Sequence, residues 1–209
     1  MSSSLIVYTI GFIAQAFFSA RILVQWFLSE KRKEVVSPDL FWIFSLAGSI
    51  LLFIYGWLRD DFAIILGQFI TYYVYLWNLR VKGVFNRWPK WMTVTAKLLP
   101  LLAVISVAND VDDFALRFFH NDAVRTWLIL FGSAGQIIFT LRFVYQWYYS
   151  HKLQESKLPM GFWLISIIGS VIIISYAIYR KDPVLIIGQS FGMISYVRNI
   201  MLLHKKKKQ

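Results

Sequence analysis

Seven apolar segments, each long enough to cross a membrane, limit most strongly what this chain can fold into. A helix rises about 1.5 Å per residue, so about 20 residues span the roughly 30 Å hydrocarbon core of a bilayer. Hydrophobic residues make up 58% of the 209 residues, a larger share than soluble domains carry. The sequence therefore predicts an all-α membrane protein with seven transmembrane helices, at residues 5–28, 38–58, 62–80, 91–109, 123–149, 160–180 and 183–203.

The charged residues between these segments predict how the chain is oriented. If the chain crosses the membrane seven times, its basic stretches all lie on the same side. These stretches are SEKRKE, RVKGVFNRWPK, HKLQESK and the HKKKK tail. Basic loops stay in the cytoplasm, so we expect the amino terminus outside and the carboxyl terminus inside. This pattern also accounts for the net charge of +11, and we expect no nucleic acid as a partner.

The chain also contains an internal repeat. Gln15 and Gln136 lie 121 positions apart (136 − 15 = 121), and many other identical pairs follow at this offset without a gap. They include Arg21 and Arg142, Gln25 and Gln146, Tyr55 and Tyr176, Arg59 and Arg180, Asp61 and Asp182, Gln68 and Gln189, and Asn78 and Asn199.

A repeat of three helices would be inverted in its second copy unless one additional helix crosses the membrane between the copies. The segment 91–109 can serve as this spacer. We therefore predict a 3+1+3 arrangement of two parallel three-helix repeats with four parts: the repeats 5–80 and 123–203, the linker 81–122, and a basic tail at 204–209.

Two motifs occur in both repeats. W-x-x-S-x-x-G-S begins at Trp42 and at Trp163, and R-x-D followed by G-Q begins at Arg59 and at Arg180. On these motifs the chain resembles the lipid A biosynthesis amino-terminal domain family, named for its occasional fusion to lipid-A-disaccharide synthase and similar to the PQ-loop and SWEET transporters. The resemblance implies a bacterial inner-membrane protein with two three-helix units around a central path. In these 209 residues we expect no glycosyltransferase domain.

Two arginines in the apolar segments are the first candidate site. Arg21 lies about eight residues, or about 12 Å, from the cytoplasmic end of its helix, and Arg142 is its repeat partner. A charge at the bilayer centre costs about 2.5–3.5 kcal/mol, unless the side chain snorkels to the interface. None of the 11 carboxylates lies at this depth. A bidentate phosphate suits a guanidinium, so we predict that both arginines bind an anionic lipid headgroup, with Gln25 and Gln146 one turn further along.

Further polar residues recur on one face of the third helix of each repeat. This spacing predicts either a lined path or hydrogen bonds that join the helices. The resemblance to SWEET transporters implies that the asparagines contact the substrate. The second candidate set is Gln68, Tyr75, Asn78, Gln189, Tyr196 and Asn199.

The outer turns of the two repeats each carry an arginine and an aspartate. We expect Arg59 with Asp61, and Arg180 with Asp182, to tie the turn, to close an external gate, or to form a plain surface salt bridge. The tryptophans near helix ends are expected to form interfacial belts, namely Trp26, Trp42, Trp88, Trp91, Trp147 and Trp163.

Catalytic residues are not indicated. The chain has no cysteine and its three histidines lie in loops, so we expect no enzyme activity, no metal and no cofactor. One enzyme alternative is a transferase that holds a divalent ion at Asp110, Asp112 and Asp113.

The main functional prediction is a transporter or flippase for an anionic lipid-linked saccharide, such as a lipid A-related glycolipid or a polyprenyl-phosphate sugar. The alternatives are a SWEET-like carrier of free sugar or small solute, and a membrane subunit or adaptor of a lipid A or glycolipid biosynthetic enzyme. The expected partners are an anionic lipid, a glycosyltransferase, or a second copy of the chain.

Overall fold

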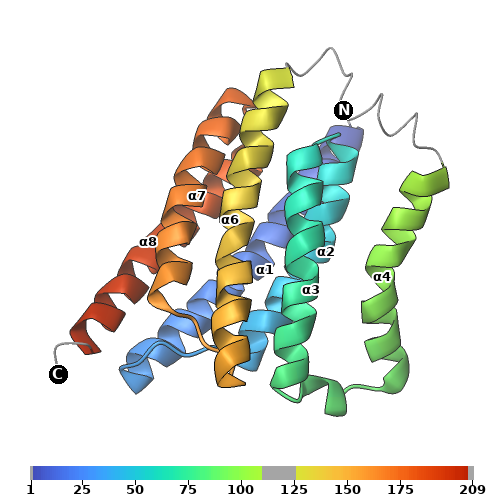
Figure 1. The fold of residues 1–209 in the computed structure, drawn as a ribbon. Coiled ribbons are helices and arrows are strands. Elements are labelled where there is room, and N and C mark those ends of the chain that lie inside the picture. Colours follow the sequence, from blue (N-terminus) through green and yellow to red (C-terminus); the bar gives the residue numbers. More distant parts are fainter. Residues whose placement is uncertain (1, 110–125, 207–209) are drawn as a thin grey trace.

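The computed structural model describes residues 2–109 and 126–206, and within them every long element is a helix (Figure 1). The helices are α1 (Ser2–Arg32), α2 (Asp39–Leu58), α3 (Phe62–Val81), α4 (Lys90–Asn109), α6 (Thr126–Leu153), α7 (Met160–Tyr179) and α8 (Pro183–Lys206), with a short 3-10 helix at Val84–Asn86. The all-α prediction is confirmed. In the described part of the chain, six helices are long and apolar enough to cross a membrane, namely α1, α2, α3, α6, α7 and α8.

The six apolar helices form a closed ring. Each packs against the next in the order α1, α2, α3, α6, α7, α8, and α8 returns to α1. In Figure 1, α1 and α6 run in the same direction, and the two labelled termini lie at opposite ends of the bundle. Helix α4 stands beside α3, outside the ring. Its crossing of the membrane, the 3+1+3 arrangement and the orientation remain predictions.

The helices begin and end at equivalent residues in the two repeats. Asp61 caps α3 by accepting a hydrogen bond from the Ile64 amide (3.1 Å), and Asp182 accepts one from the Leu185 amide (3.1 Å) at the start of α8. The turns repeat as well, because the left-handed φ angles of four non-glycine residues fall at matching positions. These are Lys33 (56°) and Gln154 (51°), and Asp60 (49°) and Lys181 (51°).

Two tryptophans lie in the core rather than at the membrane interface. Trp42 and Trp163 are 0% and 1% exposed, and they pack with Tyr75, Tyr196 and Phe143 in one buried cluster. The prediction of an interfacial belt is wrong for these two, because neighbouring loops and helices cover them. Trp91 is 70% exposed.

Candidate functional site

The two arginines lie inside the ring and have matching partners. Arg21 is 5% exposed, and its Nη1 donates to the Ser45 hydroxyl (2.8 Å) and to the Tyr75 hydroxyl (3.4 Å). Arg142 is 2% exposed, and its Nη1 donates to the hydroxyls of Ser166 (3.3 Å) and Tyr196 (3.0 Å). These partners also lie 121 positions apart. Both guanidiniums are therefore held in the interior instead of extending to a membrane surface.

Aromatic rings surround both charges. The Arg21 guanidinium carbon lies 4.6 Å from the ring centre of Phe18, and that of Arg142 lies over Phe139. Phe143 is shared, with its ring centre 5.6 Å from Arg21 and 4.6 Å from Arg142. Cation–π contacts of this kind partly replace the hydration that the charges lose. Among the described residues, neither arginine forms an ion pair, and the Nε of each has no hydrogen-bond partner.

A small polar cavity lies between the arginines and the turns that join α2 to α3 and α7 to α8. Its volume is about 40 Å³, and its lining includes both arginines, Gln68, Gln189, Tyr75 and Tyr196 of the predicted set, together with Gln15, Gln136, Thr71 and Thr140. By this measure one water needs about 10–15 Å³, so the space holds a few waters but no saccharide headgroup. The structure thus brings most of the predicted binding residues together around a closed space.

On one side of this cavity, the remaining predicted polar residues pair with each other across the repeats. Gln25 Nε2 donates to Asn199 Oδ1 (2.8 Å), and Asn199 Nδ2 donates back to Gln25 Oε1 (3.2 Å). Gln146 and Asn78 form the same reciprocal pair, at 3.0 Å and 3.1 Å. All four side chains are fully buried. In this conformation they join the helices, which is the alternative that the sequence left open.

At the opposite side of the cavity, the aspartates of the outer turns also bind across the repeats. The Tyr55 hydroxyl donates to Asp182 Oδ2 (2.9 Å), and Arg59 Nη2 lies 3.7 Å from the same oxygen. The mirrored contacts join the Tyr176 hydroxyl (2.6 Å) and Arg180 Nη2 (3.7 Å) to Asp61 Oδ2.

The expected pairs within each turn are therefore wrong, and so is the surface salt bridge, because Asp61 and Asp182 are only 4% and 1% exposed. Burial raises the pKa of Asp61, whereas Tyr176 and Arg180 act to lower it. Sequence reasoning gave Tyr55 and Tyr176 no role, although their identity at the repeat offset was the available signal.

A wider hollow of about 630 Å³ lies between the loops 33–38 and 154–159. The hydroxyls of Ser37 and Ser156 meet at its base (2.8 Å), and Trp42 Nε1 donates to both, at 2.8 Å and 3.1 Å. Ser156 also donates to Asn78 Oδ1 (2.8 Å), which belongs to one of the buried amide pairs. The serines and amide pairs thus separate this hollow from the central cavity. Its lining carries three basic and three acidic side chains, and two ion pairs join them, Lys82 with Asp39 (3.3 Å) and Lys157 with Glu155 (3.0 Å).

The acidic alternative site is not placed by the structure. Asp110, Asp112 and Asp113 lie outside the described residues. Within residues 2–109 and 126–206, no group of three or more His, Asp and Glu side chains could hold a metal ion. The candidate site is therefore the symmetric polar centre of the ring.

The known proteins with similar sequences have names that refer to lipid A. A family model described as "Lipid A Biosynthesis N-terminal domain" matches residues 10–80 and 131–201, which are offset by the same 121 positions. The chain is 30% identical over 211 residues to a lipid-A-disaccharide synthase of Chlamydia pneumoniae, and 26% identical over 217 residues to that of Chlamydia trachomatis serovar D.

These alignments cover 97% and 96% of this chain but 34% of each relative, so the chain spans about a third of their length. No solved structure matches it.

Proposed function

Because this chain belongs to the Lipid A Biosynthesis N-terminal domain family, we propose that it is the membrane subunit of a lipid A or glycolipid biosynthetic enzyme. One observation carries the proposal: nearly the whole chain aligns with one third of lipid-A-disaccharide synthases, in which this region and the remainder share a polypeptide. We propose that the present region works in the same way beside a glycosyltransferase.

The proposed subunit gives the glycosyltransferase a fixed position at the membrane and a binding site for its lipid. We place it in the inner membrane of a bacterium, with the carboxyl terminus in the cytoplasm. The hollow between the two loops then faces the cytoplasm, where the partner enzyme and a lipid headgroup can reach it. The transfer chemistry belongs to the partner enzyme.

Deleting the gene tests this role. Without the chain, the lipid that accepts the sugar should accumulate in the membrane and the glycosylated product should fall, as measured by mass spectrometry of extracted lipids. An affinity-tagged chain should also retain the lipid-A-disaccharide synthase of the same organism in mild detergent. Unchanged lipids together with no retained synthase would show that the proposal is wrong.

A second candidate is a flippase for an anionic lipid-linked saccharide, and the closed polar cavity is the observation that favours it. The cavity contains two buried guanidiniums, and matched contacts between the repeats close the bundle on both of its sides. Such a state suits alternating access, in which one set of contacts separates at a time. A headgroup could reach Arg21 and Arg142 only after such an opening, because about 40 Å³ is too small for it.

Flux of a fluorescent polyprenyl-phosphate sugar across proteoliposomes tests this candidate. The Arg21→Gln/Arg142→Gln double variant should lose flux if the guanidiniums bind the phosphate. A SWEET-like carrier of neutral sugar would instead transport glucose equally well with and without both arginines. Flux of the anionic lipid that survives in the double variant would eliminate the headgroup role of the arginines.

A further inference from the structure

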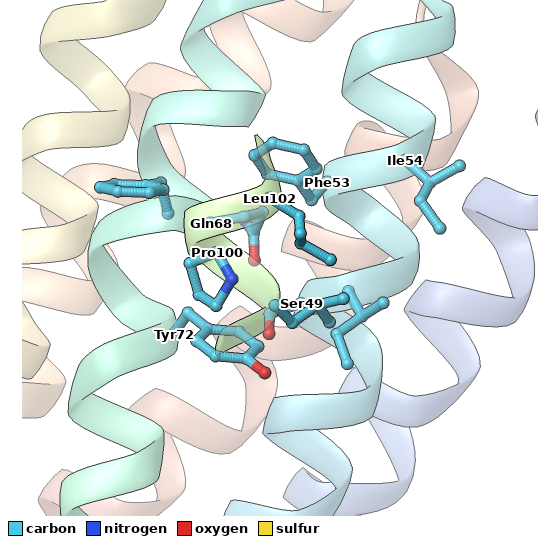
Figure 2. Close-up of a pocket in the computed structure, with 10 residues that line it drawn as sticks. Ser49, Phe53, Ile54, Gln68, Tyr72, Pro100 and Leu102 are labelled. Atoms are coloured by element: carbon cyan, nitrogen blue, oxygen red, sulfur yellow. The ribbon is translucent and has the colours of Figure 1, made fainter. Parts of the chain in front are cut away.

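A pocket of about 280 Å³ lies outside the ring, where α4 stands beside α2 and α3 (Figure 2). Its lining is almost entirely apolar and includes Ile50, Phe53, Ile54, Phe69, Leu99 and Pro100. The labelled polar side chains in Figure 2 are Ser49, Gln68 and Tyr72. The pocket therefore offers an apolar environment with a few hydrogen-bonding groups, which is typical of ligand sites.

The two repeats differ at this place in one hydrogen bond. In the second repeat, the Ser170 hydroxyl donates to Gln189 Oε1 (2.8 Å). In the first repeat, the equivalent Ser49 hydroxyl donates instead to the Leu46 carbonyl (2.8 Å). Gln68 Oε1 is consequently buried without a hydrogen-bond partner among the described residues. A buried acceptor without a donor is costly, so this carbonyl is suited to a donor from a bound molecule.

Helix α4 supplies the outer wall of the pocket and is attached through a residue that the second repeat lacks. The Tyr72 hydroxyl donates to the Ala96 carbonyl on α4 (2.7 Å). The residue 121 positions later is Met193, which has no hydroxyl. The first repeat thus has both the unpartnered acceptor, Gln68 Oε1, and the additional helix, α4, which packs against it.

We propose that this pocket binds one acyl chain of a membrane lipid, and that a hydroxyl or amide N–H on that chain donates to Gln68 Oε1. Two of the helices that line the pocket, α2 and α3, are apolar and long enough to cross a membrane, so lipid chains are the molecules that surround it. A plain hydrocarbon chain fills the apolar lining but leaves the acceptor unpaired, whereas a chain that carries a donor satisfies both. This site does not depend on the proposed partner enzyme.

Gln68 also connects the pocket with the interior, because it lines both this pocket and the central cavity. Gln68 is the one residue that the described linings of the two spaces have in common.

The test compares two lipids that differ in one hydroxyl. Purified full-length protein is placed in nanodiscs of phosphatidylcholine with myristoyl chains or with β-hydroxymyristoyl chains, and the retained lipid is measured by native mass spectrometry. A single neutral hydrogen bond of about 1 kcal/mol predicts roughly fivefold stronger retention of the hydroxylated lipid.

The repeat offers a matched control. Gln68→Leu should abolish the preference for the hydroxylated lipid, whereas Gln189→Leu should preserve it, because Gln189 already has a donor in Ser170. If Gln68→Leu does not fold, Leu99→Trp tests the pocket from α4 by filling it, and it should reduce retention of both lipids. Equal retention of the two lipids by the wild type, or the same preference in Gln68→Leu, would overturn the proposal.

Discussion

The two seams at which the repeats meet are equivalent in sequence position but differ in chemistry at their rims. Between α1 and α8, Arg198 forms two hydrogen bonds with Glu30, one of them at 3.0 Å. The equivalent positions between α3 and α6 are Trp77 and His151, whose ring centres are 6.1 Å apart. Trp77 also contacts Trp147, at 6.2 Å. One rim is thus an ion pair and the other is an aromatic cluster.

Deeper in the bundle, the same seams are alike. Each contains one reciprocal glutamine–asparagine pair with all its side chains fully buried, and each ends at an aspartate that binds a tyrosine and an arginine of the other repeat. A buried polar group that loses its partner is costly, whereas a rim residue can exchange its partner for solvent. After the duplication, residues at the rims could therefore change independently, whereas each interior residue was constrained by its buried partner.

Removing an interior aspartate should lower the stability of the protein more than any of the following changes. Asp61→Ala or Asp182→Ala leaves a tyrosine hydroxyl and a guanidinium without their shared acceptor, and each should lower the free energy of unfolding by about 3 kcal/mol. The measurement is thermal unfolding in one detergent. Glu155→Ala, which removes a 65% exposed carboxylate, serves as the control. Losses as small as that of the control would contradict the interior role.

The asparagines should give a smaller and unequal effect. Replacing either by leucine leaves a buried glutamine unpaired and should cost about 1–3 kcal/mol. Asn78→Leu should cost more than Asn199→Leu, because Asn78 Oδ1 accepts from Ser156 of the other repeat (2.8 Å), whereas the additional hydroxyl contact of Asn199, to Ser195, is longer (3.2 Å) and lies within its own helix. Thermal unfolding of the two variants side by side provides the comparison, and the reverse order would exclude a structural role for Ser156.

Replacing either buried tryptophan by phenylalanine removes the same side-chain volume, so the stabilities of the two variants can be compared directly. Trp42→Phe removes an indole that donates to Ser37 and Ser156, whereas Trp163 Nε1 has no partner among the described residues. Trp42→Phe should therefore destabilise the protein by about 1 kcal/mol more than Trp163→Phe. Equal midpoints of unfolding would show that the serine contacts contribute nothing.

The smallest effect is expected at the rims. Glu30→Gln removes the partially exposed ion pair with Arg198, so it should remove part of the salt dependence of the unfolding midpoint. His151→Gln should leave that salt dependence unchanged, since its seam is joined by ring contacts. A loss of salt dependence in His151→Gln alone would reverse this assignment.

The helices could be predicted from the sequence because long apolar segments leave few alternatives. Helix α2 was expected at 38–58 and runs Asp39–Leu58. The first helix was expected at 5–28, whereas α1 extends from Ser2 to Arg32, because the charged residues after the apolar segment continue a helix readily.

The members of the site were also visible in the sequence, but their partners were not. The offset identified Asp61 and Arg59 as repeated residues, and their closeness in the chain suggested a pair within the turn. Asp61 instead caps α3 and receives Tyr176 and Arg180 from the other repeat. Such pairing depends on the pseudo-twofold arrangement of the repeats in space, which cannot be predicted from the spacing of nearby residues in the sequence.

Phe143 shows what a single duplicated chain permits. It lies within cation–π distance of both arginines and contacts Tyr75 of the first repeat and Phe162 of the second, with ring centres 4.9 Å and 5.3 Å away. Its repeat partner is the smaller Ile22. Identical subunits would have to present two phenylalanines or two isoleucines here, and close packing accepts neither excess volume nor a void. One covalent chain can place a single ring between two like charges, an arrangement closed to any homodimer of its half.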